Sequence, residues 1–178
     1  MYVYELCKGL KLLEEGVSEF GWWIDPKTGH RLANATYIDV VPRLHGSDGL
    51  KRSSIYTYEF RHEYSLKLKR DWHDVLAKLV GFDRENPDAY PADGPFIELL
   101  HYDYETFGPS AARKIVADFD AWNERASKVM VKVWSSESLD TYHGYDDAFY
   151  LTYCWLRSCF ANATTNGIVR SYCQLYSS

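Results

Sequence analysis

The sequence predicts an α+β fold in which a small, mostly antiparallel sheet packs against three to four helices in a single domain. Short aromatic and β-branched runs lie between turn residues, which is typical of strands. Other segments carry apolar residues three and four positions apart, which is typical of amphipathic helices. The chain has 178 residues, of which 46% are hydrophobic, and this length is enough for one domain with its own core.

The first 50 residues are predicted to form an extension, a helix followed by a hairpin, ahead of a core at 51–178. Apolar residues recur at helical spacing from Tyr4 to Glu15, and a glycine follows where a helix would end. Aromatic and β-branched runs at 20–24 and 37–41 flank a turn with proline and glycine, which predicts the hairpin.

The middle of the chain predicts a helix and then an acidic loop. From His62 to Val80, apolar residues fall at helical spacing, and Gly81 stands where a helix ends. The segment from Asp83 to Gly94 combines prolines with acids, which favours an exposed loop. Seven carboxylates lie between Asp83 and Glu105 against the single basic residue Arg84, so the sequence allows a local acidic patch.

The second half predicts two helices and two strands. Phe96–Tyr104 is expected to be a strand, and Gly108-Pro109 opens a helix because proline is tolerated at the first helical position. The buried face of that helix is predicted to consist of Ala112, Ile115, Val116, Phe119, Trp122 and Ala126. Asp146–Ala161 is predicted to be a mostly buried helix, and an Asn-Gly turn leads into a final strand at 168–175. The run at 129–134 fits neither type clearly.

Composition limits the classes of function. The formal net charge is −5 and the basic residues are scattered, so direct nucleic-acid binding is not expected. No apolar run is long enough to span a bilayer, and the four cysteines show no metal-binding spacing, so we expect a soluble cytoplasmic protein with reduced thiols. The chain also has 15 Tyr, 8 Phe and 6 Trp, which favours an aromatic core over an aromatic contact surface because they occur in every segment.

The order of several motifs resembles a family of small uncharacterised phage and prophage proteins. The matching residues are Trp72, Leu76-Ala77, Leu79, Gly81, the run GPFIELLHY from Gly94, Gly108-Pro109, Lys114 and Ala117-Asp118-Phe119. The resemblance covers about 55–169 and implies a strand, an acidic turn and a helix in this order. The family usually has a Ser-Asp-Cys-Glu-Gly turn, whereas this chain has Tyr102-Asp103-Tyr104-Glu105-Thr106, so a site that needs the thiol would be missing.

Three residues in or directly before that turn are weak candidates for catalysis. His101, Asp103 and Glu105 alternate, so on a strand they would point to one side and could serve a hydrolase or hold a metal ion. The structural alternative is that Asp103 and Glu105 cap or flank the helix at Pro109, and we favour it. We therefore assign no catalytic residue, no metal and no cofactor.

Other chemically active residues carry still weaker signals. His62-Glu63, His73-Asp74 and His143 could contribute to an acid–base or metal site, but no metal or catalytic motif includes them. His73 follows Trp72 on a predicted helix, so it is expected to face solvent. Cys154 and Cys159 lack a nucleophile signature and are expected to be inert packing residues.

The sequence thus favours a non-enzymatic phage or prophage accessory protein that binds and inhibits a host protein, of the kind that blocks antiviral defence, such as an anti-CRISPR. The residues expected to bind that partner are Asp83, Glu85, Asp88, Tyr90, Asp93, Tyr102 and Tyr104. One alternative is a small-molecule binder that sequesters a nucleotide signal, with phosphate near Arg113 or Lys114. The other is a hydrolase using His101, Asp103 and Glu105. The oligomeric state stays open, with a homodimer among the options.

Overall fold

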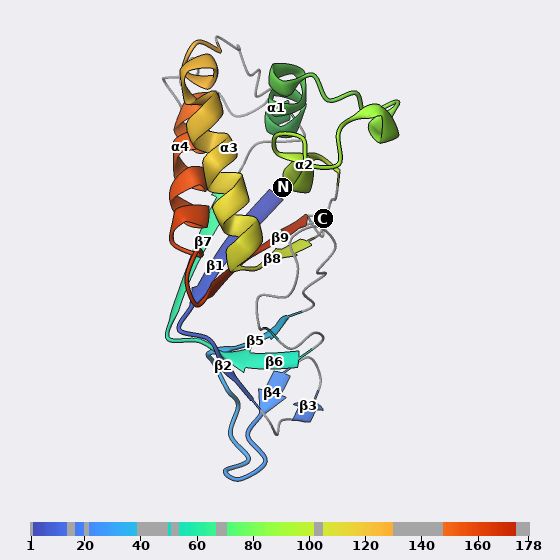
Figure 1. The fold of residues 1–178 in the computed structure, drawn as a ribbon. Coiled ribbons are helices and arrows are strands. Elements are labelled where there is room, and N and C mark those ends of the chain that lie inside the picture. Colours follow the sequence, from blue (N-terminus) through green and yellow to red (C-terminus); the bar gives the residue numbers. More distant parts are fainter. Residues whose placement is uncertain are drawn as a thin grey trace, which may run out of the picture.

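The computed structural model has an α+β fold in which antiparallel sheets combine with four helices. It describes residues 2–13, 17–19, 22–38, 50, 54–66, 71–101, 105–129 and 148–173. Figure 1 shows the helices above the larger sheet and the smaller strands below it. The predicted fold class is therefore confirmed.

The larger sheet has four strands in the order β7 (Phe60–Leu66), β1 (Tyr2–Lys8), β9 (Gly167–Cys173) and β8 (Glu105–Phe107). Every neighbouring pair is antiparallel. Strand β1 has a partner on each side over its whole length. The first residues of the chain therefore pair with strands from the segment 51–178.

The predicted N-terminal helix is wrong, because Tyr2–Lys8 is a strand. Leu6 and Leu10 are four positions apart, which fits a helix, but the two side chains pack into different clusters. Leu6 faces the helices, whereas Leu10 and Cys7 pack against the smaller sheet. A strand covered on both faces is apolar at nearly every position, so it loses the alternation that identifies a strand.

A bent two-stranded ribbon joins the larger sheet to a three-stranded sheet. Beyond Gly9 the chain of β1 continues as β2 (Lys11–Leu12), and β6 (Ser54–Thr57) leads into β7. The bend requires glycine, because Gly9 has a φ of 66° and a Cβ there would lie 2.8 Å from the Cβ of Glu59. Strand β5 (Ala35–Ile38) pairs with β6 and completes this sheet.

The predicted hairpin is right at its turn and wrong in its second strand. The backbone N–H of Gly29 donates to the carbonyl of Asp25 at 2.8 Å, and Ile24 pairs with Arg31 beyond this turn. However, β5 pairs with β6, and β4 (Trp22–Ile24) pairs with β3 (Val17–Glu19). The predicted loop at 45–49 lies outside the described residues.

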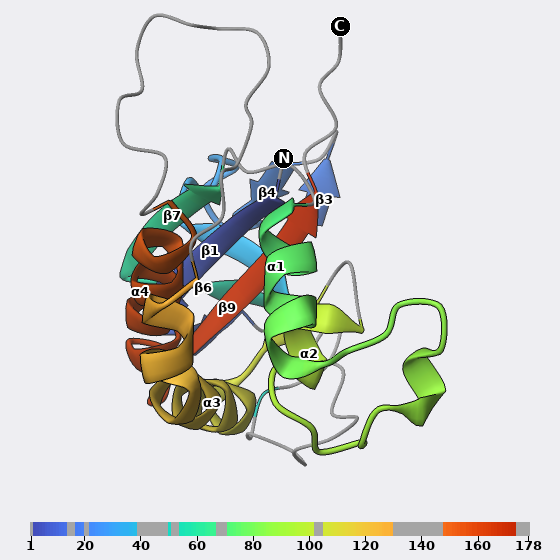
Figure 2. The ribbon, with the colours of Figure 1, turned by 90° about the horizontal axis from the view of Figure 1, so that it is seen from above.

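Helices cover one face of the larger sheet (Figure 2). They are α1 (Asp71–Val80), α2 (Ile97–Leu100), α3 (Pro109–Ser127) and α4 (Ala148–Ala161). A short 3₁₀ turn follows α1 at Pro87–Ala89. The core between these helices and the sheet is largely aromatic, with Phe119 edge-on to both Phe96 and Tyr153 at ring distances of 4.9 and 4.6 Å.

Two predicted elements change type. The helix expected from His62 begins at Asp71, and His62–Leu66 belongs to β7 instead. The strand expected at Phe96–Tyr104 is wrong, because Ile97–Leu100 forms α2 and β8 begins at Glu105. All four residues of α2 are buried, so the run has no exposed positions to mark its period.

The later predictions are largely confirmed. Helix α3 starts at Pro109 after the N-cap Gly108, and Ala112, Ile115, Phe119 and Ala126 are buried. The predicted turn before β9 is present, since Asn166 has a φ of 46°. In α4, however, Leu151 and Trp155 are 48% and 51% exposed, so the burial predicted for them is wrong.

Of the predicted run at 129–134, the structure describes Val129, and the other residues lie outside the described part of the chain. Within the part of the chain that the structure describes, we find no helix whose length and apolar content would let it cross a membrane.

Candidate functional site

The structure does not place the proposed catalytic residues on one strand. His101 follows α2 and is exposed, Glu105 begins β8, and Asp103 lies outside the described residues. The N-cap of α3 is Gly108, so neither acid caps this helix, while Glu105 on β8 lies shortly before it. The described residues contain no group of three or more His, Cys, Asp or Glu side chains that could hold a metal ion.

The acidic loop that follows α1 is exposed, as predicted. The side chains of Asp83, Glu85, Asp88 and Asp93 all lie on the surface. Asp83 shapes the start of the loop, because its Oδ1 accepts a hydrogen bond from the backbone N–H of Glu85 at 2.9 Å. In Figure 2 this loop stands away from the helices.

Tyr90 fixes the far end of the same loop. Its hydroxyl donates to the carbonyl of Pro95 at 3.1 Å, and its ring meets Phe82 edge-on with centroids 5.2 Å apart. Tyr90 is therefore half-buried and makes part of the loop's own packing. Tyr102 and Tyr104, which we also expected to contact a partner, lie outside the described residues.

A buried polar cluster lies where this loop meets α3. Lys114 Nζ contacts the carbonyl oxygen of Gly94 at 2.7 Å, Glu98 Oε2 at 2.9 Å and Asp118 Oδ2 at 2.7 Å. Asp118 Oδ2 also accepts a hydrogen bond from the backbone N–H of Phe96 at 2.9 Å. Residues that carried the family resemblance thus form one contact network.

This cluster has a structural role. Phe96 has a φ of 57°, a left-handed conformation that is strained for a bulky residue, and the bond to Asp118 helps to hold it. Burial raises the pKa of Asp118, while the contacts with Lys114 and the Phe96 N–H oppose that shift. Lys114 is fully engaged here and Arg113 donates to the carbonyl of Thr164 at 2.9 Å, so the two expected phosphate-binding residues contact the protein itself.

His73 is buried at 4% exposure, so its predicted position facing solvent is wrong. Its Nε2 lies 2.7 Å from the hydroxyl of Tyr4, and its ring centroid lies 4.4 Å from that of Tyr2. The neighbouring Trp72 meets the His73 ring edge-on with centroids 5.2 Å apart, and it donates from Nε1 to the carbonyl of Phe149 at 3.1 Å. His73 is buried against Tyr2 and Tyr4 on β1. Trp72 is buried against Phe149 on α4.

A small pocket lies beside His73. Its lining consists of Tyr2, Tyr4, His73, Arg84, Leu99, Leu100, Phe107 and Ser171, and it has space for about one water-sized group. The Nδ1 of His73 is buried and has no hydrogen-bond partner within the described structure. Burial lowers the pKa of His73 to about 4, and the nearby Arg84 cation acts in the same direction, so the imidazole is neutral at pH 7.

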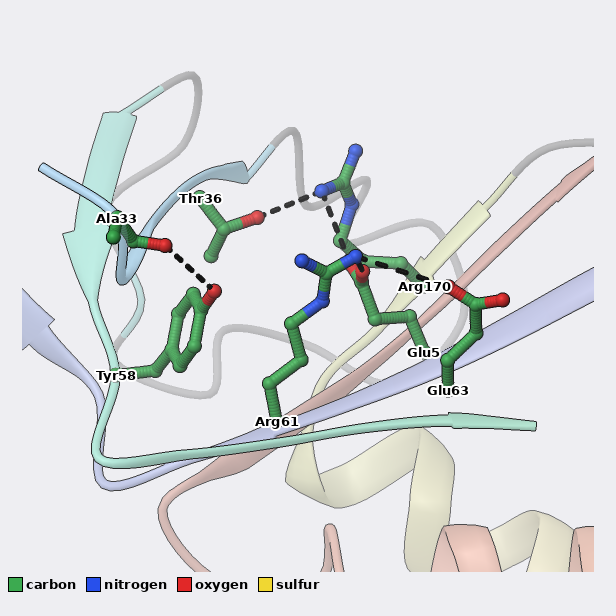
Figure 3. A network of polar contacts seen from close by, with 7 residues as sticks. All are labelled: Glu5, Ala33, Thr36, Tyr58, Arg61, Glu63 and Arg170. Carbon is green, nitrogen blue, oxygen red and sulfur yellow. Dashed lines mark hydrogen bonds and ion pairs between the residues drawn. The ribbon is translucent and has the colours of Figure 1, made fainter. Parts of the chain in front are cut away.

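A second buried charge cluster lies on the opposite face of the sheet (Figure 3). Glu5, on the central strand β1, is 3% exposed and makes ion pairs with Arg61 on β7 and with Arg170 on β9, the latter at 3.4 Å. Arg170 Nη1 also donates to Thr36 Oγ1 on β5 at 2.7 Å. The cluster therefore links three strands of the larger sheet to the smaller sheet.

Of the two cysteines that we considered as nucleophiles, Cys154 is half-buried, and Cys159 lies in unreactive surroundings. Cys159 is fully buried, and burial raises its pKa. Burial also raises the pKa of Cys7 to about 12, and the charge of Glu5 adds to this effect. Both side chains therefore remain thiols at neutral pH.

Comparison with known proteins identifies no relative. No protein-family model, curated protein or solved structure matches this chain.

Proposed function

We propose that this chain is a non-enzymatic accessory protein of a phage or prophage that binds a host protein and inhibits a component of antiviral defence, in the manner of an anti-CRISPR. The observation that supports a binding role is the loop at 83–93. It presents four exposed carboxylates, from Asp83, Glu85, Asp88 and Asp93, on a backbone that the protein's own contacts define.

The loop is ordered before any partner binds. Asp83 closes a side-chain turn at its start, Pro87–Ala89 forms a 3₁₀ turn in its middle, and Tyr90 fixes its end. Arg84 is held by Asp74 on α1 at 2.9 Å, which separates this cation from the acids beyond it. Since little backbone freedom remains to be lost, binding costs less conformational entropy than it would for a disordered loop.

The charge of the loop indicates the chemistry of the partner. A surface rich in Lys and Arg would complement these carboxylates, and such complementarity mainly raises the association rate and the specificity. Binding should therefore weaken as ionic strength increases.

The experiment compares two double variants with the same change in net charge. In Glu85→Lys with Asp88→Lys, two exposed loop acids are reversed while the turn at Asp83 is kept. In the control, Glu59→Lys with Glu124→Lys reverses two exposed acids elsewhere, whose side chains are 69% and 83% exposed. Each protein is immobilised at micromolar concentration in bacterial host lysate, and the retained proteins are quantified by mass spectrometry.

We expect a host protein to be retained by the wild type and by the control but not by the loop variant. Circular dichroism should show that all three proteins are folded. If no protein is retained by the wild type, or if both variants lose the same partner equally, the proposed function is wrong.

One observation favours the second candidate function, small-molecule binding. The unpartnered Nδ1 of His73 lines a pocket together with the cation of Arg84. The pocket is small, so a nucleotide would have to enlarge it, which is why this candidate ranks second. A thermal-shift screen with nucleotides tests it, because a ligand that binds the folded state raises the melting temperature, and His73→Phe should abolish that rise.

A further inference from the structure

We propose that two copies of this chain pair through the outer edges of their β7 strands to form a two-fold dimer with one continuous sheet. Within the described residues, β1 is the one strand that pairs with β7, and β7 forms the rim of the sheet (Figure 2). The proposed dimer is independent of the acidic loop and of the host partner.

The two rims of the sheet differ in length. Strand β8, at one rim, has three residues, whereas β7, at the other, has seven and pairs with β1 in an unbroken register from Phe60 to Leu66. Natural proteins commonly protect an exposed edge with a short strand, a proline, a bulge or charged side chains. Strand β7 has seven residues and neither a proline nor a bulge, and its charges at Arg61 and Glu63 are of opposite sign, so a second copy of the same strand can pair with it.

The charges on β7 select one antiparallel register. Arg61 and Glu63 lie two positions apart, so they share one face of the sheet. If the two-fold axis passes at His62, each Arg61 lies directly opposite Glu63 of the second copy, which gives two favourable cross-strand pairs. If the axis passes instead at Glu63 or Arg61, two like charges face each other, which is unfavourable.

Arg61 is already held in position for this contact (Figure 3). Its guanidinium is bound by the buried Glu5, and its Nη2 lies 3.9 Å from Glu63 Oε2 on the same strand. The side chain is nevertheless 45% exposed, and a guanidinium carries five N–H donors, so it can bind a further carboxylate. The arginine therefore loses little side-chain entropy when a second copy binds.

An aromatic surface lies on the other face of the same strand. Phe60 is 49% exposed, and its ring stacks on His62 with centroids 6.4 Å apart and planes at 7°. In the register centred on His62, the two His62 residues face each other and the Phe60 rings flank them, so dimerisation covers exposed aromatic area. An antiparallel partner strand that complements Arg61 and Glu63 must itself carry a basic and an acidic residue two positions apart. Strand β7 has this spacing, so we choose a second copy rather than an unrelated peptide.

The experiment measures the dimer dissociation constant by sedimentation equilibrium for the wild type and three variants. Glu63→Lys places a lysine opposite Arg61 of the second copy, so the dissociation constant should rise about tenfold or more. Glu124→Lys changes the net charge equally at an exposed site on α3 and should leave the constant unchanged. Hydrogen exchange of the β7 amides should slow with increasing protein concentration in the wild type and not in Glu63→Lys.

Glu63→Gln distinguishes the registers by the sign of its effect. In the proposed register it removes an attraction and weakens the dimer, whereas in a register centred on Glu63 it removes a repulsion and strengthens the dimer. In dilute solution, where the proteins are monomeric, both Glu63 variants should keep the melting temperature of the control, because an exposed ion pair contributes little to folding. A wild-type protein that stays monomeric at about 100 µM, well above typical dissociation constants of specific dimers, overturns the proposal. So does a dimer that Glu63→Lys leaves intact or Glu63→Gln strengthens.

Discussion

Glu98 and Glu5 are buried carboxylates of nearly equal exposure, 4% and 3%, but their surroundings differ in charge. In the helical layer, Lys114 contacts both Glu98 and Asp118, so the two acids share this cation. Between the sheets, Arg61 and Arg170 both contact Glu5, so two cations serve one acid.

The cations also differ in their access to water. The Lys114 side chain is 21% exposed, whereas Arg170 and Arg61 are 33% and 45% exposed. A cation near the surface can be solvated when its partner is removed, while acids inside the protein cannot. The stability of the helical layer should therefore depend more strongly on its charge cluster than the contact between the sheets does.

The largest effect is expected for Lys114→Met. It leaves Glu98 and Asp118 buried without this cation and removes the contact to the Gly94 carbonyl, so the free energy of unfolding should fall by about 3 to 5 kcal/mol. Denaturant unfolding followed by circular dichroism measures this loss. Arg113→Met on the exposed side of the same helix is the control and should cost less than about 1 kcal/mol. Equal losses in the two variants would show that the charge cluster around Lys114 does not stabilise the helical layer.

His73 extends the comparison to a buried polar group that is neutral. Its pKa is about 4 in the folded protein and about 6.5 in the unfolded chain. Burial is the larger cause of this difference and the Arg84 cation the smaller, because both disfavour the charged imidazole. The unfolded chain therefore binds the proton first as the pH falls. Stability should fall between about pH 6.5 and pH 4, by an amount on the order of 3 kcal/mol, and should lose no more from this group below that range.

The control for this pH dependence is His73→Phe, which has no titratable group at this position. The groups that face His73 are Tyr2 and Tyr4 on β1, Trp72 on its own helix and Arg84 in the loop. As the pH falls, the wild type should lose stability from His73 while the variant does not, so the variant should become more stable relative to the wild type. A constant difference from pH 7 to pH 4 would show that His73 does not titrate as a buried group.

A smaller effect is expected for Glu5→Gln. The amide still accepts hydrogen bonds, and both arginines can turn toward water, so the loss should be about 2 kcal/mol. Glu59→Gln, at an acid that is 69% exposed in its pair with Lys11, should change stability by less than about 0.5 kcal/mol. A loss for Glu5→Gln as large as that for Lys114→Met would remove the distinction between the two clusters.

The elements that could be predicted from the sequence are those with local signals. Helices α3 and α4 and the turn before β9 carry local signals, such as Pro109 at a first helical position and Asn166-Gly167 at a turn. These were predicted correctly. Strand β1 and helix α2 are buried at nearly every position, so they lack the alternation of exposed and buried residues on which a prediction depends.

The cluster around Glu5 and the contact between Tyr4 and His73 could not be predicted, because their members are far apart in the chain. Glu5 and Arg170 are 165 positions apart, and Tyr4 and His73 are 69 apart. A signal existed in one case, since Glu5 is a charged residue inside an apolar run, and such a residue needs a partner when buried. The sequence does not indicate which of its 20 basic residues provides that partner.

The smallest effect, expected for Asp118→Asn, tests whether the helical cluster carries excess negative charge. Burial raises the pKa of Asp118, with the charge of Glu98 adding to this effect, so the folded protein takes up the proton before the unfolded chain does as the pH falls. The wild type therefore gains stability from this group on acidification, and that gain is lost as the pH rises through the folded pKa. Asparagine stays neutral and can still accept from the Phe96 N–H, so the variant should differ from the wild type by less than about 1 kcal/mol at pH 7. Between pH 7 and pH 4, the free energy of unfolding of the variant should fall relative to that of the wild type. A change in the opposite direction would mean that Lys114 balances both acids.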